Sequence, residues 1–487
     1  MKPYSIEKAR NYINGAWVQS NSKEEIIVYN PATGERIGAV PSGSASDVDA
    51  AVAAAKKAFP AWSETPAAVR ARYLFDLRNL MEAHFDELCS ICTQEHGKTF
   101  EESKGDVRRA IDNVETAAGI PSLMMGQALE QVAPGIDCVS VRQPAGVFAA
   151  IAPYNFPSMV PFWFLPYAIA TGNTIVIKPS EQVPFSQVRA FELISELKLP
   201  PGVVNMVQGG RDVVNALVEH RDIVGVSFVG SSPVAQHVYE RASATGKRVQ
   251  ALGGAKNFTI VIDDCNWEKS VANIIDSAFA CTGQRCLATS VVIGVGGAYD
   301  RLKRELVEQA KRITVGYGLD AGVTMGPLIS ETHRARVISY IEKGVKEGAE
   351  LLLDGRDCKV ASYPKGHFLG ATIFGNVTSA MTIGREEIFG PVLSLMRADS
   401  LDEAIKIVNA HPLANASSIY TSAGAAARRY THAVHASMVG VNIGVAAPMS
   451  YFGFGGAKGS FLGDLKAHGR ESILFYTNSK TAISRWW

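Results

Sequence analysis

Residues 147–178 read VFAAIAPYNFPSMVPFWFLPYAIATGNTIVIK. Two short apolar runs, Val147–Ile151 and Thr174–Ile177, stand at the ends of this stretch, and prolines interrupt what lies between them. A membrane-spanning helix needs about 20 predominantly apolar residues in a row. Although no charge occurs between Arg142 and Lys178, the prolines break the stretch too often for such a helix. We therefore interpret it as buried core with a strand at each end.

The same kind of strand recurs further along the chain. Strand candidates follow at Val203–Val207, Val224–Val229 and Thr259–Ile262, and helical patterns at Ser186–Lys198 and Asp212–His220 lie between the runs. Strands that alternate with helices indicate βαβ units and a parallel sheet. The predicted fold class is α/β.

The rest of the chain adds a second α/β region and two isolated strands. From about Asp47 the next hundred residues are mainly helical in pattern. The second region has helical patterns at Glu268–Ala280, Tyr299–Ile313 and Thr332–Gly348, with strand candidates at Ser290–Ile293 and Val392–Met396. Asp137–Arg142 and the closing ESILFYTNSKTAIS (471–484) read as strands of a small sheet that pairs across subunits.

Composition favours a small-molecule partner. A length of 487 residues suggests two to four domains, and 47% hydrophobic against 20% charged residues is typical of a globular protein. Forty-eight basic residues against 47 acidic ones leave a net charge of +1, so no overall field attracts nucleic acid or an anionic membrane. The start of the chain has no apolar stretch typical of a signal peptide, which predicts a cytoplasmic protein.

The cysteines and histidines do not suggest a disulfide framework or a metal site. Seven cysteines are an odd count, which favours reduced thiols. Cys89 and Cys92 form a C-x-x-C inside an amphipathic run without a second pair for zinc, so we predict that they are buried. His432 and His435 have no matching carboxylates, and we expect no metal.

Five segments, in this order and at these spacings, resemble the aldehyde dehydrogenase superfamily. They are PYNFPSMVPFWFLPYAIATGNTIVIKPSEQVP (153–184), SFVGS (227–231), ALGGAKN (251–257), FACTGQRCLATS (279–290) and EEIFGPV (386–392). The resemblance covers nearly the whole chain. Three features look most like the CoA-acylating methylmalonate-semialdehyde dehydrogenase family: GQRC around Cys286, PSLMMG at 121–126 and GAKN at 254–257. The dinucleotide fingerprint G-x-G-x-x-G is absent, so a nicotinamide cofactor must be held in another way.

The resemblance implies three structural parts. A Rossmann-type NAD-binding domain is expected at 1–127 and 147–251, and an α/β catalytic domain at 252–466. The remaining segments, 128–146 and 467–487, are expected to form a small β oligomerisation element. The family likeness further implies a homodimer or homotetramer.

By this resemblance Cys286 is the nucleophile. A thiolate adds to an aldehyde carbonyl, and the adduct expels hydride to a nicotinamide and leaves a thioester. The oxygen becomes negative during addition and needs preorganised donors. The resemblance assigns this role to the Asn155 side chain and the Cys286 backbone N–H. Cys281 is predicted to be a core residue.

The cofactor residues are expected at the carboxyl edge of the predicted sheet. Lys178 ends a strand there, and Gly230 and Ser231 open a helix whose amides suit a pyrophosphate, although a plain helix cap explains them equally well from local sequence. The resemblance implies that Lys178 and Glu387 bind the two riboses of the cofactor. It adds Phe156, Glu181, Leu252 and Phe389 to the cofactor set. Glu181 would repel a 2′-phosphate, which favours NAD over NADP.

One departure from the hydrolytic relatives bears on the product. They carry Glu in E-L-G-G, whereas this sequence reads Ala251-Leu252-Gly253-Gly254. Alanine cannot accept a proton from water, so the thioester is expected to await a better nucleophile, the CoA thiol. For malonate or methylmalonate semialdehyde the resemblance adds loss of CO2, giving acetyl-CoA or propionyl-CoA.

Arginines are the candidates for the substrate carboxylate, because the guanidinium forks match its geometry. Arg109 and Arg285 match the family's carboxylate-binding pair, with Arg108 as the alternative to Arg109. By periodicity alone Arg109 lies opposite the apolar stripe, where a solvated side chain is typical. Phe258 follows GAKN where a histidine is expected, a change that we expect to alter CoA use or substrate choice.

Two other functions remain open from sequence. One is a CoA-independent, NAD-dependent dehydrogenase of another short acidic aldehyde that releases the free acid. The other is a non-catalytic NAD-binding protein on the same scaffold, which the retained Cys286, Asn155, Lys178 and Glu387 disfavour.

Overall fold

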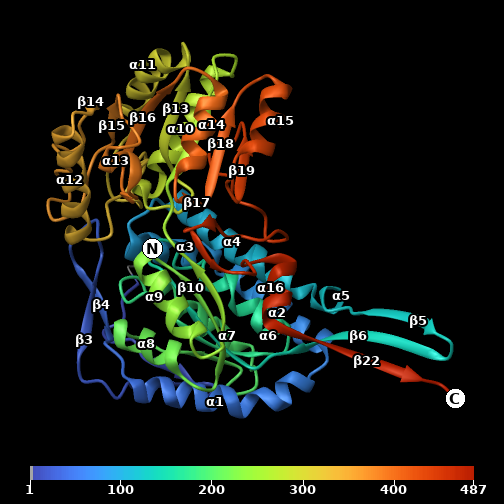
Figure 1. Cartoon of the computed structure of the whole chain (residues 1–487). Helices are drawn as coiled ribbons and strands as arrows, with labels where there is room; N and C mark the ends of the chain where they lie inside the picture. Colours follow the sequence, from blue (N-terminus) through green and yellow to red (C-terminus); the bar gives the residue numbers. More distant parts are fainter. Residues whose placement is uncertain (1–3) are drawn as a thin grey trace.

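The computed structural model describes residues 4–487 and contains two large sheets, each with helices around it (Figure 1). The strands of the first sheet are β1 (Asn11–Ile13), β2 (Ala16–Val18), β7 (Val147–Ile151), β8 (Thr174–Lys178), β9 (Val204–Met206), β10 (Ile223–Val229), β11 (Arg248–Leu252) and β21 (Phe461–Gly463). Their order is β2-β1-β9-β8-β7-β10-β11-β21. The five central strands run parallel, as predicted, and antiparallel pairs close both edges.

Helices cover both faces of the first sheet, so its central strands are buried on both sides. In β7, Phe148 and Ala150 pack with one core cluster, and Val147, Ala149 and Ile151 pack with another. This alternation follows from the period of two along a strand. The first cluster includes residues of α2 (Ala67–Ala83), α4 (Phe100–Ala118) and α7 (Phe185–Glu196), and the second includes residues of α1 (Ala45–Glu64), α8 (Arg211–Glu219) and α9 (Ser232–Ser243).

The second sheet lies above the first in Figure 1. Its strands are β12 (Asn257–Val261), β13 (Thr289–Val295), β14 (Glu350–Leu353), β15 (Thr372–Gly375), β16 (Val392–Ala398), β18 (Ala416–Tyr420) and β19 (Met438–Val441). Their order is β14-β15-β16-β13-β12-β18-β19, parallel except for the β14–β15 pair. The predicted helices of this region are present as α10 (Trp267–Phe279), α11 (Ala298–Ala310) and α12 (Glu331–Lys346).

One strand assignment from sequence needs correction. The run at 259–262 belongs to β12 of the second sheet, not to the first parallel sheet. The strand that occupies the expected place in the first sheet is β11, which the sequence reading missed. Arg248 and Gln250 interrupt its apolar pattern, because Arg248 reaches the end of α16 (Gly469–Tyr476) and Gln250 donates to the Lys466 carbonyl.

A three-stranded arm projects from the body (Figure 1). It pairs β22 (Thr477–Arg485) with β6 (Ile136–Pro144) and β6 with β5 (Gln127–Ala133), all antiparallel. The closing segment was expected to be a strand from residue 471, but residues 471–476 lie in α16 and only the second half is extended. The ILFY run is helical because Ile473, Phe475 and Tyr476 dock into the core.

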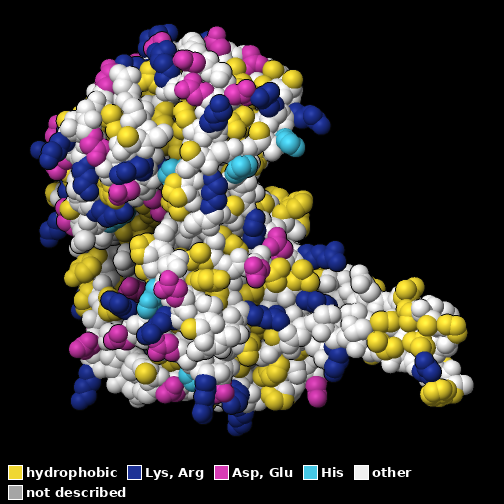
Figure 2. Space-filling model, in the orientation of Figure 1, with side chains coloured by type: hydrophobic (Ala, Val, Ile, Leu, Met, Phe, Trp, Pro, Cys, Tyr) yellow, Lys and Arg dark blue, Asp and Glu magenta, His cyan; other side chains and the backbone are white. Residues whose placement is uncertain are grey.

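Apolar side chains gather on this arm (Figure 2). The exposed ones include Leu129, Val132, Val139, Val141 and Ile483. Elsewhere, Cys89 and Cys92 are buried in α3 (Phe85–His96), which confirms their predicted packing. No helix within residues 4–487 combines the length and apolar character needed to span a membrane.

Candidate active site

A cavity of about 490 Å³ borders Cys286. Its walls come from α4, from residues 156–163, from the loop after α10 and from residues 443–468. Among the side chains that line it are Phe156, Trp163, Arg109, Arg285, Cys286 and His468. Four residues predicted from sequence therefore share one cavity.

The loop that carries Cys286 begins with a left-handed turn. Cys281, Thr282 and Gly283 have φ values of 52°, 56° and 69°. Such angles are unfavourable for residues with a Cβ. Glu102 accepts a hydrogen bond from the Cys281 amide at 2.6 Å, which helps to hold the turn. A Cβ at Gly283 would lie 2.1 Å from the Gly390 carbonyl oxygen, so this position requires glycine.

Two asparagine side chains fix the backbone of Cys286. Asn257 and Asn415 each donate from Nδ2 to the Cys286 carbonyl at 2.9 Å. Burial, together with the charge of Glu387, raises the pKa of the Cys286 thiol to about 12, and Arg285 partly opposes this rise. In the ligand-free protein the thiol is therefore protonated at neutral pH.

The Asn155 side chain contacts the loop that carries Cys286. Its side-chain amide donates to the Gln284 carbonyl at 3.0 Å, two residues before Cys286. An amide nitrogen carries two hydrogens, so the second is available to another acceptor. The structure thus brings together the two residues predicted to form the oxyanion site.

The two arginines predicted to bind a carboxylate both line the cavity. Within residues 4–487, the Arg285 guanidinium has no hydrogen bond or ion pair to another side chain or to the backbone. Arg109 contacts the Met449 sulfur at 2.9 Å and lies 3.7 Å from Asp112. Arg285 is therefore a cation beside Cys286 that is available to an anion.

Arg108 is excluded as the alternative to Arg109. It pairs with Glu82 at 2.5 and 2.9 Å and does not line the cavity. Helical periodicity placed Arg109 on a solvated face. That face is covered by the segment around Met449, which turns it into a cavity wall.

Four of the residues predicted to contact the cofactor, Lys178, Gly230, Ser231 and Leu252, lie at the carboxyl ends of parallel strands of the first sheet. Lys178, at the end of β8, donates to Glu181 and to the Gly209 carbonyl, both at 2.8 Å. Ser231 precedes α9 without capping it through its side chain, and the Gly230 amide donates to the Leu252 carbonyl. Free amides in the first turn of α9 suit a pyrophosphate. These residues fit a dinucleotide at this edge.

Glu387 connects this edge to the nucleophile. Its Oε1 accepts a hydrogen bond from the Ala255 amide at 3.0 Å, just beyond β11, while its charge acts on Cys286. Burial raises the pKa of Glu387 to about 7. Phe389 has a left-handed φ of 60° and stands edge-on to Tyr154 at 6.0 Å between ring centres. Phe156, the residue after Asn155, lines the cavity.

Two positions singled out in the sequence lie in the core. Ala251 is fully buried in β11 and supplies no titratable group to the cavity. Phe258 packs against His411, with ring centres 5.4 Å apart, inside the second core. Its side chain does not line the cavity, and the expected effect of Phe258 on CoA use or substrate choice stays a prediction.

Sequence reasoning missed His468. Its side chain is 4% exposed, its φ is 73°, and neither ring nitrogen has a partner among the described residues. The ring packs against both Trp163 and Phe454, which also contact each other, in the cavity wall. Burial, with the nearby charge of Arg109, lowers its pKa to about 3, so the imidazole is neutral. No periodicity or motif marks this position.

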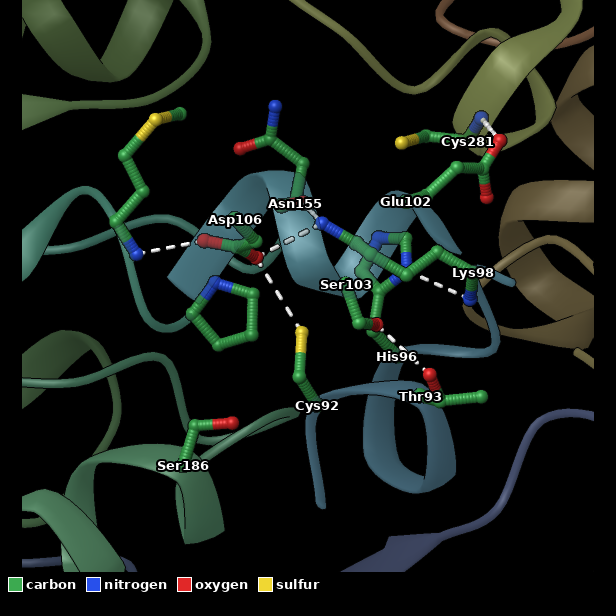
Figure 3. Close-up of polar contacts among 12 residues, drawn as sticks. Cys92, Thr93, His96, Lys98, Glu102, Ser103, Asp106, Asn155, Ser186 and Cys281 are labelled. Atoms are coloured by element: carbon green, nitrogen blue, oxygen red, sulfur yellow. Dashed lines mark hydrogen bonds and ion pairs between the residues drawn. The ribbon is translucent and has the colours of Figure 1, made fainter. Parts of the chain in front are cut away.

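The buried pair of Lys98 and Asp106, drawn in Figure 3, was also missed. It lies beneath Asn155 at the start of α4. The sequence around Lys98 is polar and gives no sign that this side chain is buried. The burial arises only when α4 packs onto the segment around Asn155, whose carbonyl binds Lys98. Within the described part of the chain, no three His, Cys, Asp or Glu side chains are grouped to hold a metal ion.

A cysteine beside a cavity between two α/β sheets, close to a sheet edge suited to a dinucleotide, is typical of a thiol-dependent oxidoreductase. The aldehyde dehydrogenase family model matches residues 17–482, and the chain belongs to this family. A malonate-semialdehyde dehydrogenase of Geobacillus kaustophilus is 51% identical over 98% of both chains.

Solved structures agree with this assignment. A methylmalonate-semialdehyde dehydrogenase of Oceanimonas doudoroffii superposes with a TM-score of 0.97 at 42% identity, over 99% of both chains. A structure from Sinorhizobium meliloti, assigned to the same activity and complexed with NAD, gives a TM-score of 0.97 at 41% identity, over 99% of this chain and 98% of that one. The predicted fold class and family are confirmed.

Proposed function

We propose that the protein is an NAD-dependent dehydrogenase of malonate or methylmalonate semialdehyde that transfers the acyl group to CoA. The observation that carries this proposal is the unpaired Arg285 guanidinium, which shares a cavity with Arg109 and Cys286. Arg285 is half-buried, and a partly desolvated guanidinium without a hydrogen-bond partner favours an anionic ligand. The names of the similar proteins support the same substrate class.

The chain's own residues supply the addition step. Cys286, once deprotonated, forms a C–S bond to the aldehyde carbon, and the π electrons of C=O move to oxygen. The second Nδ2 hydrogen of Asn155 and the Cys286 backbone N–H are the proposed donors to that oxygen. Arg109 and Arg285 hold the substrate carboxylate, so the aldehyde faces the sulfur.

The proposed cofactor residues are Lys178, Glu181, Gly230, Ser231, Leu252, Phe156, Glu387 and Phe389. NAD, when bound there, supplies the hydride acceptor that allows the Cys286 adduct to become a thioester. The Lys178–Glu181 pair leaves a carboxylate at this edge, which supports NAD rather than NADP.

Release of the acyl group is assigned to CoA. Because Ala251 offers no base, water at that position is not activated. The CoA thiolate attacks the thioester carbon and expels the Cys286 thiolate, while loss of CO2 from the substrate accounts for acetyl-CoA or propionyl-CoA. Glu387, whose pKa is raised to about 7, favours a second candidate function in which it activates water and a free acid is released.

Assembly and location complete the proposal. The exposed apolar strands of the arm support a homodimer or homotetramer in which this arm is covered. All seven cysteines are free, which supports a reducing, cytoplasmic setting. The domain division at residues 127, 147, 251 and 466 stays a proposal, with two exceptions near the end of the chain: β21 (Phe461–Gly463) pairs with β11 in the first sheet, and α16 packs on the first core cluster.

The test follows NADH at 340 nm with each semialdehyde, with and without CoA, while mass spectrometry identifies the products. Multiple turnovers that need CoA, with acetyl-CoA or propionyl-CoA as product, would support the main proposal. Turnover without CoA that yields a free acid would favour the second function. Propanal, which lacks the carboxylate, is the control for the role of the arginines.

A further inference from the structure

An ion pair of two fully buried side chains lies under the proposed oxyanion site. Lys98 and Asp106 are both 0% exposed, and Nζ lies 2.9 Å from Oδ2 (Figure 3). Removing two charges from water costs more than their attraction returns unless further hydrogen bonds satisfy them. What each charge binds besides its partner therefore indicates what the pair does.

Each charge holds one end of the segment that carries Asn155. Lys98 Nζ donates to the Asn155 carbonyl at 2.7 Å and lies 4.0 Å from the centre of the Phe156 ring. Asp106 Oδ1 accepts from the Met159 amide at 2.6 Å. Residues 155–159 form no helix or strand, so no backbone ladder fixes them. The hydrogen bonds from Lys98 and to Asp106 hold the segment in place of such a ladder.

The same helix reaches two other parts of the cavity. Glu102, Asp106 and Arg109 are spaced by four and three residues, which puts them on one face of α4. Glu102 binds the Cys281 amide of the nucleophile loop, and Arg109 lines the cavity. One rigid helix thereby sets the distances among the nucleophile loop, the oxyanion segment and a proposed carboxylate ligand.

We propose that Lys98 and Asp106 are positioning residues that hold Asn155 at the distance from Cys286 needed for oxyanion stabilisation. The inference rests on the donor role proposed for Asn155. A pair of apolar side chains would fill the same volume but would tether neither the Asn155 carbonyl nor the Met159 amide. A displacement of about 1 Å at a reacting centre costs on the order of 10²-fold in rate.

The test uses the full-length double variant Lys98→Met/Asp106→Leu, which leaves no unpaired buried charge, so the chain is expected to fold. With saturating semialdehyde, NAD and CoA, kcat is expected to fall about 30- to 100-fold, while KM for the semialdehyde changes less than about threefold. Iodoacetamide alkylation of Cys286 needs no oxyanion donor, so its rate should stay within about twofold.

Two further variants keep the test decisive. Lys104→Met breaks the exposed Lys104–Glu101 pair on the same helix and should leave kcat unchanged. Asp106→Asn weakens the pair without emptying the site, and we expect a loss of about threefold to tenfold. If the double variant does not fold, as measured by circular dichroism, Asp106→Asn carries the test.

Combination with Asn155→Ala separates the two claims. If Lys98 and Asp106 act through Asn155, their substitution in the Asn155→Ala background should lower kcat by less than about threefold. The full loss in that background, or wild-type kcat in the folded double variant, would overturn the positioning role. An Asn155→Ala variant with wild-type kcat would instead refute the proposed donor itself.

Discussion

The substrate cavity and the cofactor edge use charge in opposite ways. In the cavity, the Arg285 guanidinium has no hydrogen-bond or ion-pair partner within residues 4–487, and Arg109 contacts the Met449 sulfur and lies 3.7 Å from the Asp112 carboxylate. At the edge, Lys178 is already paired with Glu181 and bound to a carbonyl. Free charge in the cavity is suited to selecting a charged substrate, whereas at the edge the backbone and a neutralised pair are suited to recognising the shape of a cofactor.

The largest effect should come from the thiol that lies between the two regions. Cys286→Ala is expected to lower the rate of NADH formation by about 10⁴-fold or more with every aldehyde, because no other group can form the thioester. NAD binding, measured by calorimetry, should persist. Cys358→Ala, at another half-buried free cysteine, serves as the matched control and should keep full activity. Activity in Cys286→Ala would refute the assigned nucleophile.

Removal of the charges of Arg285 and Arg109 should weaken the preference of the cavity for a charged substrate. Arg285→Gln and Arg109→Gln are each expected to lower kcat/KM for malonate semialdehyde by about 10- to 100-fold, the range for a charge-assisted hydrogen bond. Activity with propanal should change less than about threefold. Arg108→Gln, on the next residue of the same helix but paired with Glu82, is the control. Equal losses with both aldehydes would mean that the arginines shape the loop rather than bind the carboxylate.

The pH dependence of alkylation tests whether charges from both regions change the pKa of the Cys286 thiol. With a thiol pKa of about 12, the iodoacetamide rate should rise about tenfold per pH unit from pH 7 to 10. Arg285 lowers this pKa and Glu387 raises it. At pH 8, Arg285→Gln should therefore slow alkylation and Glu387→Gln should accelerate it, each on the order of threefold. Changes of the same sign would contradict the opposed charges.

The smallest effect is expected at the cofactor edge. Glu181→Gln removes the carboxylate that would repel a 2′-phosphate, so the ratio of kcat/KM for NADP to that for NAD should rise about twofold. Glu196→Gln, an acidic residue at the end of the following helix, controls for net charge. An unchanged ratio would show that the backbone of the edge, not Glu181, discriminates between the cofactors.

Local sequence patterns predicted those strands and helices whose surroundings are the same along their whole length. Strands such as Val147–Ile151 are apolar throughout because helices cover both faces, so their signal is continuous. β11 was missed because its Arg248 and Gln250 find partners in the C-terminal segment. Residues 471–476 were assigned to a strand because a short run of apolar residues suits a buried helix equally well.

The candidate site shows the same division. Cys286, Asn155 and Arg285 were found because motifs around them are contiguous in sequence. Lys98 and His468 were not, since their roles arise from neighbours far along the chain: the Asn155 carbonyl for one, and Trp163 and Arg109 for the other. Burial that only tertiary packing creates leaves no trace in a local pattern.

The arm also has a consequence for the order of events during synthesis. β5 and β6 leave the ribosome early, but β6 pairs with β22, as in the match of Ser140 with Thr481, and β22 begins more than 300 residues later in the chain. Until β22 has been synthesised, the hairpin exposes an unpaired edge beside apolar side chains, a surface prone to aggregation. Closing so long a loop is intrinsically slow. Completion of the arm is thus a late folding step, and nascent chains that stall before residue 477 should depend most on chaperones.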